Sequence, residues 1–285
     1  MSIHLPSMGN FKCWVFIALL VAGSFSANAQ TVPKWEAGVG ALPVYIPYYR
    51  GASGAHKYVI PYPVYRFRGD KYSVNNEEGA KRWLYVSEKA QLDLSLMFGI
   101  PVNERSTQAG RAVDGLPSTF EFGPRLGLKL VDTRSHIVAI KAPVRVGFGV
   151  DFEGVYYQGW VTAPFIQYSY RTWGRNSWRL GVATGVRYSN QSYQNYYYSV
   201  PAGEDGQVAY QPPGGYGGWW NSIAVYRRLG ALELSFFGRY DFLERAAFEN
   251  SPLVETKRYP AAGMAIVWWF ARSRQSVEID SRDRY

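Results

Sequence analysis

The sequence predicts an all-β fold: a single antiparallel up-and-down transmembrane β-barrel of about twelve strands, with ten as the alternative count. Apolar and polar residues alternate with period two over segments of about ten to fifteen residues, which is longer than a typical sandwich strand and sufficient for a tilted membrane strand. Aromatic residues make up 17% of the chain, which excludes a disordered chain. No apolar run long enough for a transmembrane helix follows the N-terminal segment. A secreted β-sandwich is the remaining alternative.

The N-terminal segment has the three parts of a cleavable secretory signal. Lys12 precedes a short apolar run at residues 13–22, and Ala27-Asn28-Ala29 forms an A-x-A cleavage site. The run is too short to span a bilayer, which needs about twenty residues. We therefore expect a signal peptide at residues 1–29 and export to the outer membrane of a Gram-negative cell, with an uncleaved anchor as the alternative. The mature chain, beginning at Gln30, contains no cysteine and must hold its fold without disulfides.

Alternation and turn residues place the strands in order along a barrel domain at residues 30–270. In residues 91–100, for example, Leu92 and Leu94 share one face while Asp93 lies on the other. Every second connection is short, as expected when short periplasmic turns alternate with longer external loops. The expected strands are 34–43, 57–68, 71–76, 81–88, 89–100, 118–131, 136–150, 155–171, 177–190, 218–228, 231–242 and 260–270. Omitting the third and fourth of them gives the ten-strand alternative.

The last expected strand carries features of an assembly signal. In the run GMAIVWWF, Gly263 is followed by spaced apolar residues, among them Ile266 and Trp268, and the run ends on the aromatic Phe270. This pattern resembles the C-terminal signal that barrel-assembly machinery recognises. Residues 271–285 mix charges of both signs without periodicity, and we expect them to form a flexible periplasmic tail.

The polar faces of the long strands carry charges of both signs and should line the lumen. Cross-strand ion pairs among them would stiffen the barrel. Because basic residues outnumber acidic ones, a narrow anion-preferring path is the alternative. The lumen-facing set is Asp93, Glu121, Arg125, Lys129, Lys141, Arg145, Arg179, Arg187, Glu233, Arg239 and Asp241.

Basic residues also gather at the expected periplasmic turns. A basic rim attracts anionic partners over about a Debye length of 8–10 Å. The candidates are phospholipid headgroups, murein carboxylates and acidic patches of periplasmic proteins, and ordinary interfacial anchoring is the alternative. The partner-facing residues are Arg66, Arg68, Lys71, Arg134, Arg171, Arg175, Arg227 and Arg228.

Residue types for catalysis or metal binding are sparse. His56 and His136 are the only histidines after the signal, and the expected topology places them at opposite ends of the barrel. A nucleophile–base pair needs hydrogen-bond reach, so neither histidine supports one. Without cysteine a transition-metal site is not expected either. We expect no enzyme activity and no cofactor, and an exported barrel has no nucleic-acid partner despite its pI of about 9.5.

The Tyr-rich segment at residues 191–217 is the longest expected external loop. Tyrosine and glycine suit adaptable binding surfaces. The loop could fold inward as a plug, or outward as a contact surface for lipopolysaccharide or for a host ligand in adhesion.

Several runs of residues together resemble the MipA/OmpV family. The resemblance begins at Trp35-Glu-Ala-Gly-Val-Gly40 and is carried further by Tyr65-Arg-Phe-Arg-Gly-Asp70, Phe122-Gly-Pro-Arg-Leu-Gly-Leu128 and the closing strand up to Phe270. It implies an outer-membrane β-barrel, which we expect to be monomeric. It also implies a scaffold that joins a murein hydrolase to a murein synthase, although other members are described as adhesins or porin-like proteins. The tail after Phe270 departs from the usual ending at the aromatic.

Overall fold

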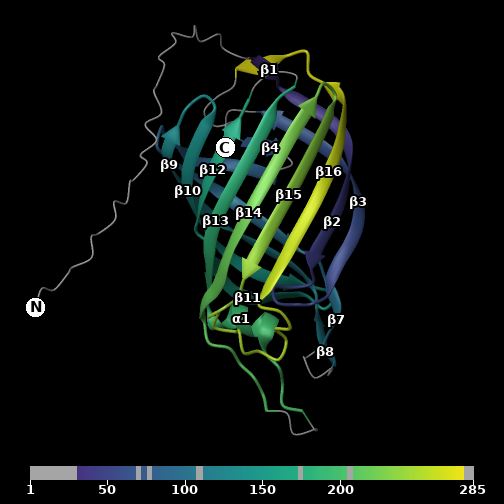
Figure 1. Cartoon of the computed structure of the whole chain (residues 1–285), viewed down its shortest axis with the longest axis vertical. Coiled ribbons are helices and arrows are strands. Elements are labelled where there is room, and N and C mark those ends of the chain that lie inside the picture. The colour runs from purple at the N-terminus through teal and green to yellow at the C-terminus, as the bar shows by residue number, and fades with distance from the viewer. Residues whose placement is uncertain are drawn as a thin grey trace, which may run out of the picture.

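A large antiparallel sheet dominates the computed structural model, which describes residues 31–68, 72–75, 79–106, 112–172, 176–203 and 208–278 (Figure 1). The signal segment at residues 1–29 lies outside the described residues. The strands of the large sheet are β2 (Trp35–Pro47), β3 (Ala55–Arg68), β4 (Tyr72–Asn75), β5 (Gly79–Val86), β6 (Ala90–Gly99), β9 (Ser118–Asp132), β10 (His136–Val150), β11 (Val155–Thr162), β12 (Phe165–Arg171), β13 (Trp178–Ser189), β14 (Gly215–Leu229), β15 (Leu232–Phe242) and β16 (Arg258–Arg272).

The pairing of these strands returns to its starting point. β9 pairs with β6 on one side and with β10 on the other, and β16 pairs with β2, so the first and last strands of the ring are joined. The sheet has thirteen strands, of which β11 and β12 follow one another at a single position between β10 and β13. The described chain therefore forms a ring of twelve positions. The short strands β4 and β5 are present, which confirms twelve rather than ten.

The interruption between β11 and β12 occurs at Pro164, which has no backbone N–H to donate to a neighbouring strand. The carbonyl oxygen of Pro164 accepts a hydrogen bond from the Val186 amide instead. Before the proline, Val161 and Thr162 already pair with β13, as β12 does after it. The pairing registers with β10 and β13 therefore continue unchanged across the proline, and the ring stays closed.

The two faces of the strands are inverted relative to a soluble protein. On β10, Lys141 and Arg145 are buried, whereas Ile140 and Val144 are 39% and 47% exposed. On β16, Trp268 is 57% exposed while its neighbour Trp269 is buried. Polar groups thus face the lumen and apolar groups face outward, as a barrel surrounded by lipid requires.

Three smaller elements define the two ends of the barrel. The strands β1 (Thr31–Pro33) and β17 (Ser276–Glu278) pair with each other at one end, which we call the terminal end. The helix α1 (Gln191–Tyr198) and the hairpin of β7 (Val102–Ser106) and β8 (Ala112–Leu116) lie at the opposite end, which we call the loop end (Figure 1).

The C-terminal segment differs from the expected flexible tail. Strand β16 continues past Phe270 to Arg272, which pairs with Glu36 of β2. The Lys34 amide then donates a hydrogen bond to the Gln275 carbonyl, immediately before the pairing of β1 with β17. Residues 271–272 and 276–278 therefore lie in paired strands, because β2 and the segment before it supply pairing partners. Residues 279–285 are outside the described residues.

Candidate functional site: the lumen and its cap

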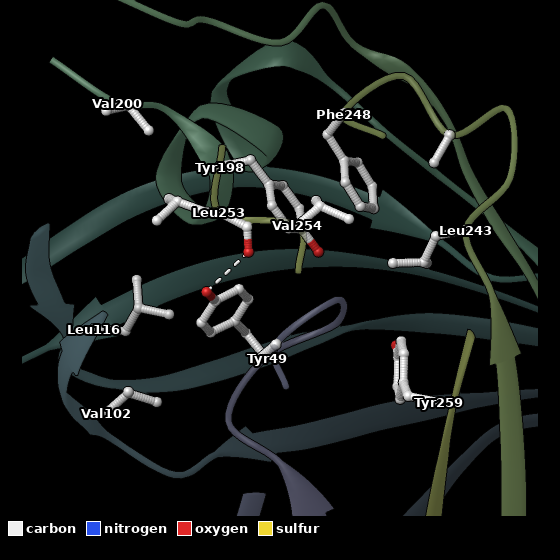
Figure 2. Packing of buried hydrophobic residues seen from close by; sticks show 12 residues of the cluster. Tyr49, Val102, Leu116, Tyr198, Val200, Leu243, Phe248, Leu253, Val254 and Tyr259 are labelled. Carbon is white, nitrogen blue, oxygen red and sulfur yellow. Dashed lines mark hydrogen bonds between the residues drawn. The ribbon is translucent and has the colours of Figure 1, made fainter. Parts of the chain in front are cut away.

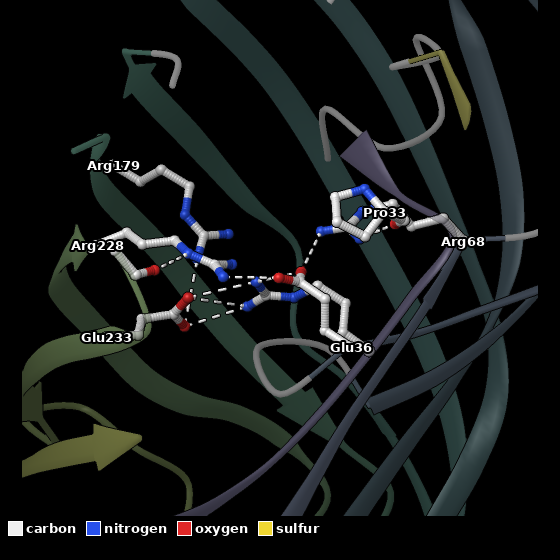
Figure 3. A network of polar contacts seen from close by, with 8 residues as sticks. Pro33, Glu36, Arg68, Arg179, Arg228 and Glu233 are labelled. Carbon is white, nitrogen blue, oxygen red and sulfur yellow. Dashed lines mark hydrogen bonds and ion pairs between the residues drawn. The ribbon is translucent and has the colours of Figure 1, made fainter. Parts of the chain in front are cut away.

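A network of buried ion pairs crosses the lumen near the terminal end (Figure 3). Glu36 of β2 is 2% exposed and accepts from Arg68 at 3.0 Å and from Arg228 at 2.6 Å. Glu233 of β15 is 5% exposed and pairs with Arg66 at 3.1 Å and with Arg179 at 3.7 Å. Arg66 also lies 3.8 Å from Glu36 and so joins the two carboxylates into one network. We call these six residues the terminal network.

An aromatic ring supports the guanidinium groups of this network. Trp269 points inward from β16, and the Cζ atoms of Arg66 and Arg228 lie 4.6 and 5.7 Å from its ring centre. A guanidinium over an indole face is attracted by the ring quadrupole, and the attraction increases when water is excluded. Burying so many charges is costly unless each has a partner. The network meets that condition by combining carboxylates with an aromatic ring.

Two further ion-pair clusters lie along the lumen wall. Asp93 accepts from Arg125 at 2.9 Å, across the pairing of β6 with β9. Glu121 accepts from Arg145 at 2.9 Å and from Arg187 at 3.3 Å. Both carboxylates are buried, so the pairs with Arg125 and Arg145 join neighbouring strands and the pair with Arg187 reaches from β9 to β13 inside the barrel.

The remaining lumen-facing charges are also placed on the inner side. Asp241 is 2% exposed and pairs with Arg239 of its own strand and with Arg50, which enters from the loop between β2 and β3. Lys129 pairs with Asp132 at 3.2 Å, and Lys141 is buried on β10. The set predicted as lumen charges therefore lies together within one enclosed interior.

The residues predicted to face a partner separate into two groups. Arg66, Arg68 and Arg228 belong to the terminal network and point into the lumen rather than out of the end of the barrel. Arg134, Arg171 and Arg227 stay at the rim of the terminal end, where Arg227 lies with its Cζ 4.5 Å from the Trp178 ring centre. The strand period explains the difference, because Arg66 and Arg68 share the inward parity of their strand. Lys71 and Arg175 lie outside the described residues.

The predicted assembly-signal residues lie on the last strand with separate roles. Ile266, Trp268 and Phe270 face outward, and the rings of Trp268 and Phe270 lie 5.8 Å apart. Gly263 is buried opposite Phe237, where a Cβ atom would lie 2.3 Å from the phenylalanine ring. The glycine therefore leaves room for the inward side chain of Phe237 where β15 and β16 pair.

Four loops fold together over the loop end into a hydrophobic core (Figure 2). The rings of Tyr198 and Phe248 stack with centroids 3.7 Å apart, and the Tyr49 hydroxyl donates to the Leu253 carbonyl at 3.0 Å. The Ser251 hydroxyl donates to the Tyr198 carbonyl at 2.7 Å. We call this core the cap; its buried members are Tyr49, Ala52, Val102, Leu116, Tyr198, Val200, Leu243, Ala246, Phe248, Leu253, Val254 and Tyr259. Of the two arrangements expected for the loop at residues 191–217, its first part adopts the inward one.

A cavity of about 290 Å³ lies between the cap and the lumen charges. Tyr49, Tyr198 and Phe248 of the cap line one side, and Glu121 and Arg187 of the lumen wall line the other. The Tyr193 hydroxyl of α1 donates to Glu121 at 2.6 Å, so the helix is anchored directly to the lumen wall. Asn190 caps the helix by accepting a hydrogen bond from the Tyr193 amide.

Some residues of the site could not be selected from the sequence. Glu36, Arg50 and Trp269 lie in the ion-pair network or next to it, yet each is an isolated residue within an apolar or loop segment. For Glu36 a signal existed, because a lone carboxylate on the inward parity of an expected strand needs a cationic partner. For Arg50 no local signal existed, since its partner Asp241 is far away in sequence.

Alkaline pH should loosen the cap. Burial raises the pKa of Tyr49 to about 12, and burial also raises the pKa of Tyr198. The closed cap therefore favours the neutral phenols, while the open cap ionises them near their ordinary pKa of about 10. We expect the stability of the closed cap to be constant below about pH 10 and to fall as the pH rises toward about 12.

This pH dependence can be followed by tyrosinate absorbance together with hydrogen exchange in α1. Tyr49→Phe removes one raised pKa and should weaken the dependence, although it also loses the bond to Leu253. A cap whose exchange protection is unchanged across this interval would contradict the prediction.

The described residues contain no cluster of three or more histidine, cysteine or carboxylate side chains suited to a metal ion. His56 lies at the loop end beside Tyr48, and His136 lies at the start of β10, where its Nδ1 is 2.9 Å from the Tyr168 hydroxyl. The two histidines are thus at opposite ends of the barrel, as expected. Within the described residues, no helix is both long and apolar enough to cross a membrane.

Solved structures with similar folds have low sequence identity. A bacterial polysaccharide outer membrane secretin matches with a TM-score of 0.40 at 8% identity, over 84% of this chain and 100% of that chain. The CymD monoaromatic hydrocarbon channel matches with a TM-score of 0.34 at 11% identity, over 84% of this chain and 89% of that chain. A Pseudomonas aeruginosa FadL homologue matches with a TM-score of 0.24 at 6% identity, over 85% of this chain and 91% of that chain. At these TM-scores the similarity carries no argument about function. Among curated proteins the chain has no match.

Family and architecture agree. A closed antiparallel barrel with an apolar outer face and a polar interior is the architecture of outer-membrane proteins, and this chain is an outer-membrane β-barrel. The model of the family described as MltA-interacting protein MipA matches residues 39–270, which is most of the barrel. On this match, the chain belongs to the MipA family.

Proposed function

We propose that this barrel is a non-enzymatic scaffold that presents its terminal end to a murein hydrolase or synthase in the periplasm. It acts as a monomer in outer-membrane lipid and lipopolysaccharide, without a cofactor. The observation that carries the proposal is that ion pairs cross the lumen and the cap covers its loop end. An occupied interior suits a structural platform better than a path for solutes. The family description, which names an MltA-interacting protein, supports a murein enzyme as partner.

The terminal end supplies a basic surface for such a partner. Arg134 is exposed on the turn between β9 and β10, and Arg171 and Arg227 lie near it in half-buried positions. Arg272 at the end of β16 and Arg274 in the link to β17 add exposed positive charge, a contribution that the sequence did not single out. Clustered positive charge increases the association rate with an acidic partner surface and makes binding sensitive to salt.

Charge reversal at this rim tests the scaffold. We expect the triple variant Arg134→Glu, Arg171→Glu and Arg227→Glu to recover at least about tenfold less murein enzyme from envelope extracts, because rim charges control association. Quantitative mass spectrometry of the co-purified proteins provides the measurement.

The matched control reverses two basic residues at the loop end, Lys57→Glu and Lys257→Glu, which should leave recovery unchanged. Both variants must show the heat-dependent gel migration of a folded barrel. Equal recovery of murein enzymes by wild type and the triple variant would count against the proposal. Arg228 is unsuitable for this test, because its reversal would place a second carboxylate beside Glu36.

A further inference from the structure

The cavity beneath the cap has the properties of a binding site for a small molecule. Its volume of about 290 Å³ is roughly twice that of an apolar cavity known to hold benzene. Aromatic side chains make up a third of its lining residues and include Tyr48, Phe98, Tyr197 and Phe248. Such rings present faces and edges that favour an aromatic occupant beyond the area it buries.

The charged groups of the lining are already neutralised by protein partners. Arg187 pairs with Glu121 and also donates to the Tyr193 hydroxyl. Arg50 donates to Asp241 and to the Gly217 carbonyl. A charged ligand would have to displace one of these buried partners, at the cost of leaving the displaced charge without compensation. The cavity therefore favours an uncharged molecule.

One of the lining residues, His56, has a ring nitrogen without a hydrogen-bond partner in the part of the chain that the structure describes. His56 is 6% exposed, and its ring lies between those of Tyr48 and Tyr58, with centroids 4.7 and 5.2 Å away. Its Nδ1 is 3.1 Å from the Tyr58 hydroxyl, while its Nε2 has no hydrogen-bond partner among the described residues. A buried polar atom left unsatisfied is costly, and a ligand that pairs with it relieves that cost.

We infer that this cavity binds a small uncharged phenol, with the ring among the aromatic side chains and the hydroxyl on the Nε2 atom of His56. The hydroxyl can donate or accept, so it satisfies either tautomer of the imidazole. This site lies at the end of the barrel opposite the proposed partner surface, and it does not depend on the scaffold function.

Titration of the detergent-solubilised barrel with three matched probes tests the site. The probes are p-cresol, toluene, which lacks the hydroxyl, and 4-methylcyclohexanol, which lacks the aromatic ring. Saturation-transfer NMR or calorimetry should show p-cresol binding up to about tenfold more tightly than either analogue, the difference expected for one hydrogen bond in a buried site.

Two variants assign the binding to the cavity. His56→Phe keeps a ring between Tyr48 and Tyr58 but lacks the nitrogen, so the preference for p-cresol over toluene should disappear. The same substitution at the opposite end, His136→Phe, should leave that preference intact. Leu116→Trp fills part of the cavity and should abolish saturable binding of all three probes.

Three results would overturn the inference. They are equal affinity for p-cresol and toluene in the wild-type barrel, a preference for p-cresol that survives His56→Phe, and binding to Leu116→Trp or to empty micelles that matches the wild type. The first result is decisive even where a variant fails to fold, because it uses the unmodified chain.

Discussion

Replacing Glu36 by alanine should lower the free energy of unfolding by about 3–5 kcal/mol, the cost of breaking a buried ion pair from one side. Glu36 accepts from Arg68 and Arg228 and lies near Arg66, so its loss removes a buried carboxylate from beside three guanidinium groups. Urea titration of the barrel in micelles, followed by tryptophan fluorescence, measures the change.

Two comparison variants separate the effect of losing the buried charge of Glu36 from the effect of losing its side-chain volume. Glu36→Gln keeps the shape of the side chain and should still lose most of the stability, because a neutral amide does not compensate the arginines. Glu244→Ala removes the carboxylate of an exposed pair with Arg258 and should cost less than about 1 kcal/mol. If the Glu36 and Glu244 variants lost similar stability, the terminal network would not be a principal stabiliser of the barrel.

The second large effect is expected at the cap. Phe248 is 2% exposed and stacks on Tyr198, and Phe248→Ala should cost the closed cap about 3–5 kcal/mol through lost burial and a cavity. Opening of the cap should then increase by roughly a hundred- to a few-thousand-fold. Because the barrel strands pair independently of this core, we expect local opening rather than global unfolding.

Hydrogen exchange distinguishes local opening of the cap from global unfolding of the barrel. Amides of α1 and of residues 243–254 should lose protection in Phe248→Ala, while amides of β14 and β15 should keep it. Phe152→Ala is the matched control, since Phe152 is fully exposed at the turn after β10. Loss of protection throughout the barrel would show that the cap and barrel unfold together, contrary to expectation.

Planar-bilayer conductance of the same variant addresses the channel alternative. A wild-type barrel that stays electrically silent, together with a Phe248→Ala barrel that conducts intermittently, would identify the cap as the closure of the lumen. If the wild type instead carried a steady current whose ion selectivity changed with Arg145→Glu, the anion-preferring channel would replace the scaffold. Adhesion through residues 191–217 makes a separate prediction, that deleting this loop abolishes binding to a host or matrix ligand.

The barrel strands were predictable because membrane strands repeat a simple local pattern. Each long strand alternates apolar and polar residues, and the expected bounds 136–150 agree with the observed β10. The interruption at Pro164 was missed within an expected strand at 155–171, although proline is the residue that breaks a ladder. The hairpin of β7 and β8 fell within an expected loop, since its strands are too short to show a clear period.

The lumen and the cap differ in what local sequence reveals. Parity along a strand assigns Arg145 and Glu121 to the inner face, and their ion pair then follows from the pairing of neighbouring strands. No such rule applies to loops. Tyr49, Tyr198 and Leu253 meet in one core only because the ring brings three distant loops to the same end of the barrel.

By itself the sequence determined the class of fold and placed charged residues such as Arg145 and Glu121 on the inner face, because the two-residue strand period and the lipid environment act on every strand locally. The choice between twelve and ten strands was decided by the pairing of β4 and β5. Only the tertiary structure decided that Arg66, Arg68 and Arg228 belong to the lumen network, that residues 271–272 and 276–278 pair rather than hang free, and that the external loops form a cap over an aromatic cavity. These features depend on partners far apart in the chain, which become neighbours only when the ring closes.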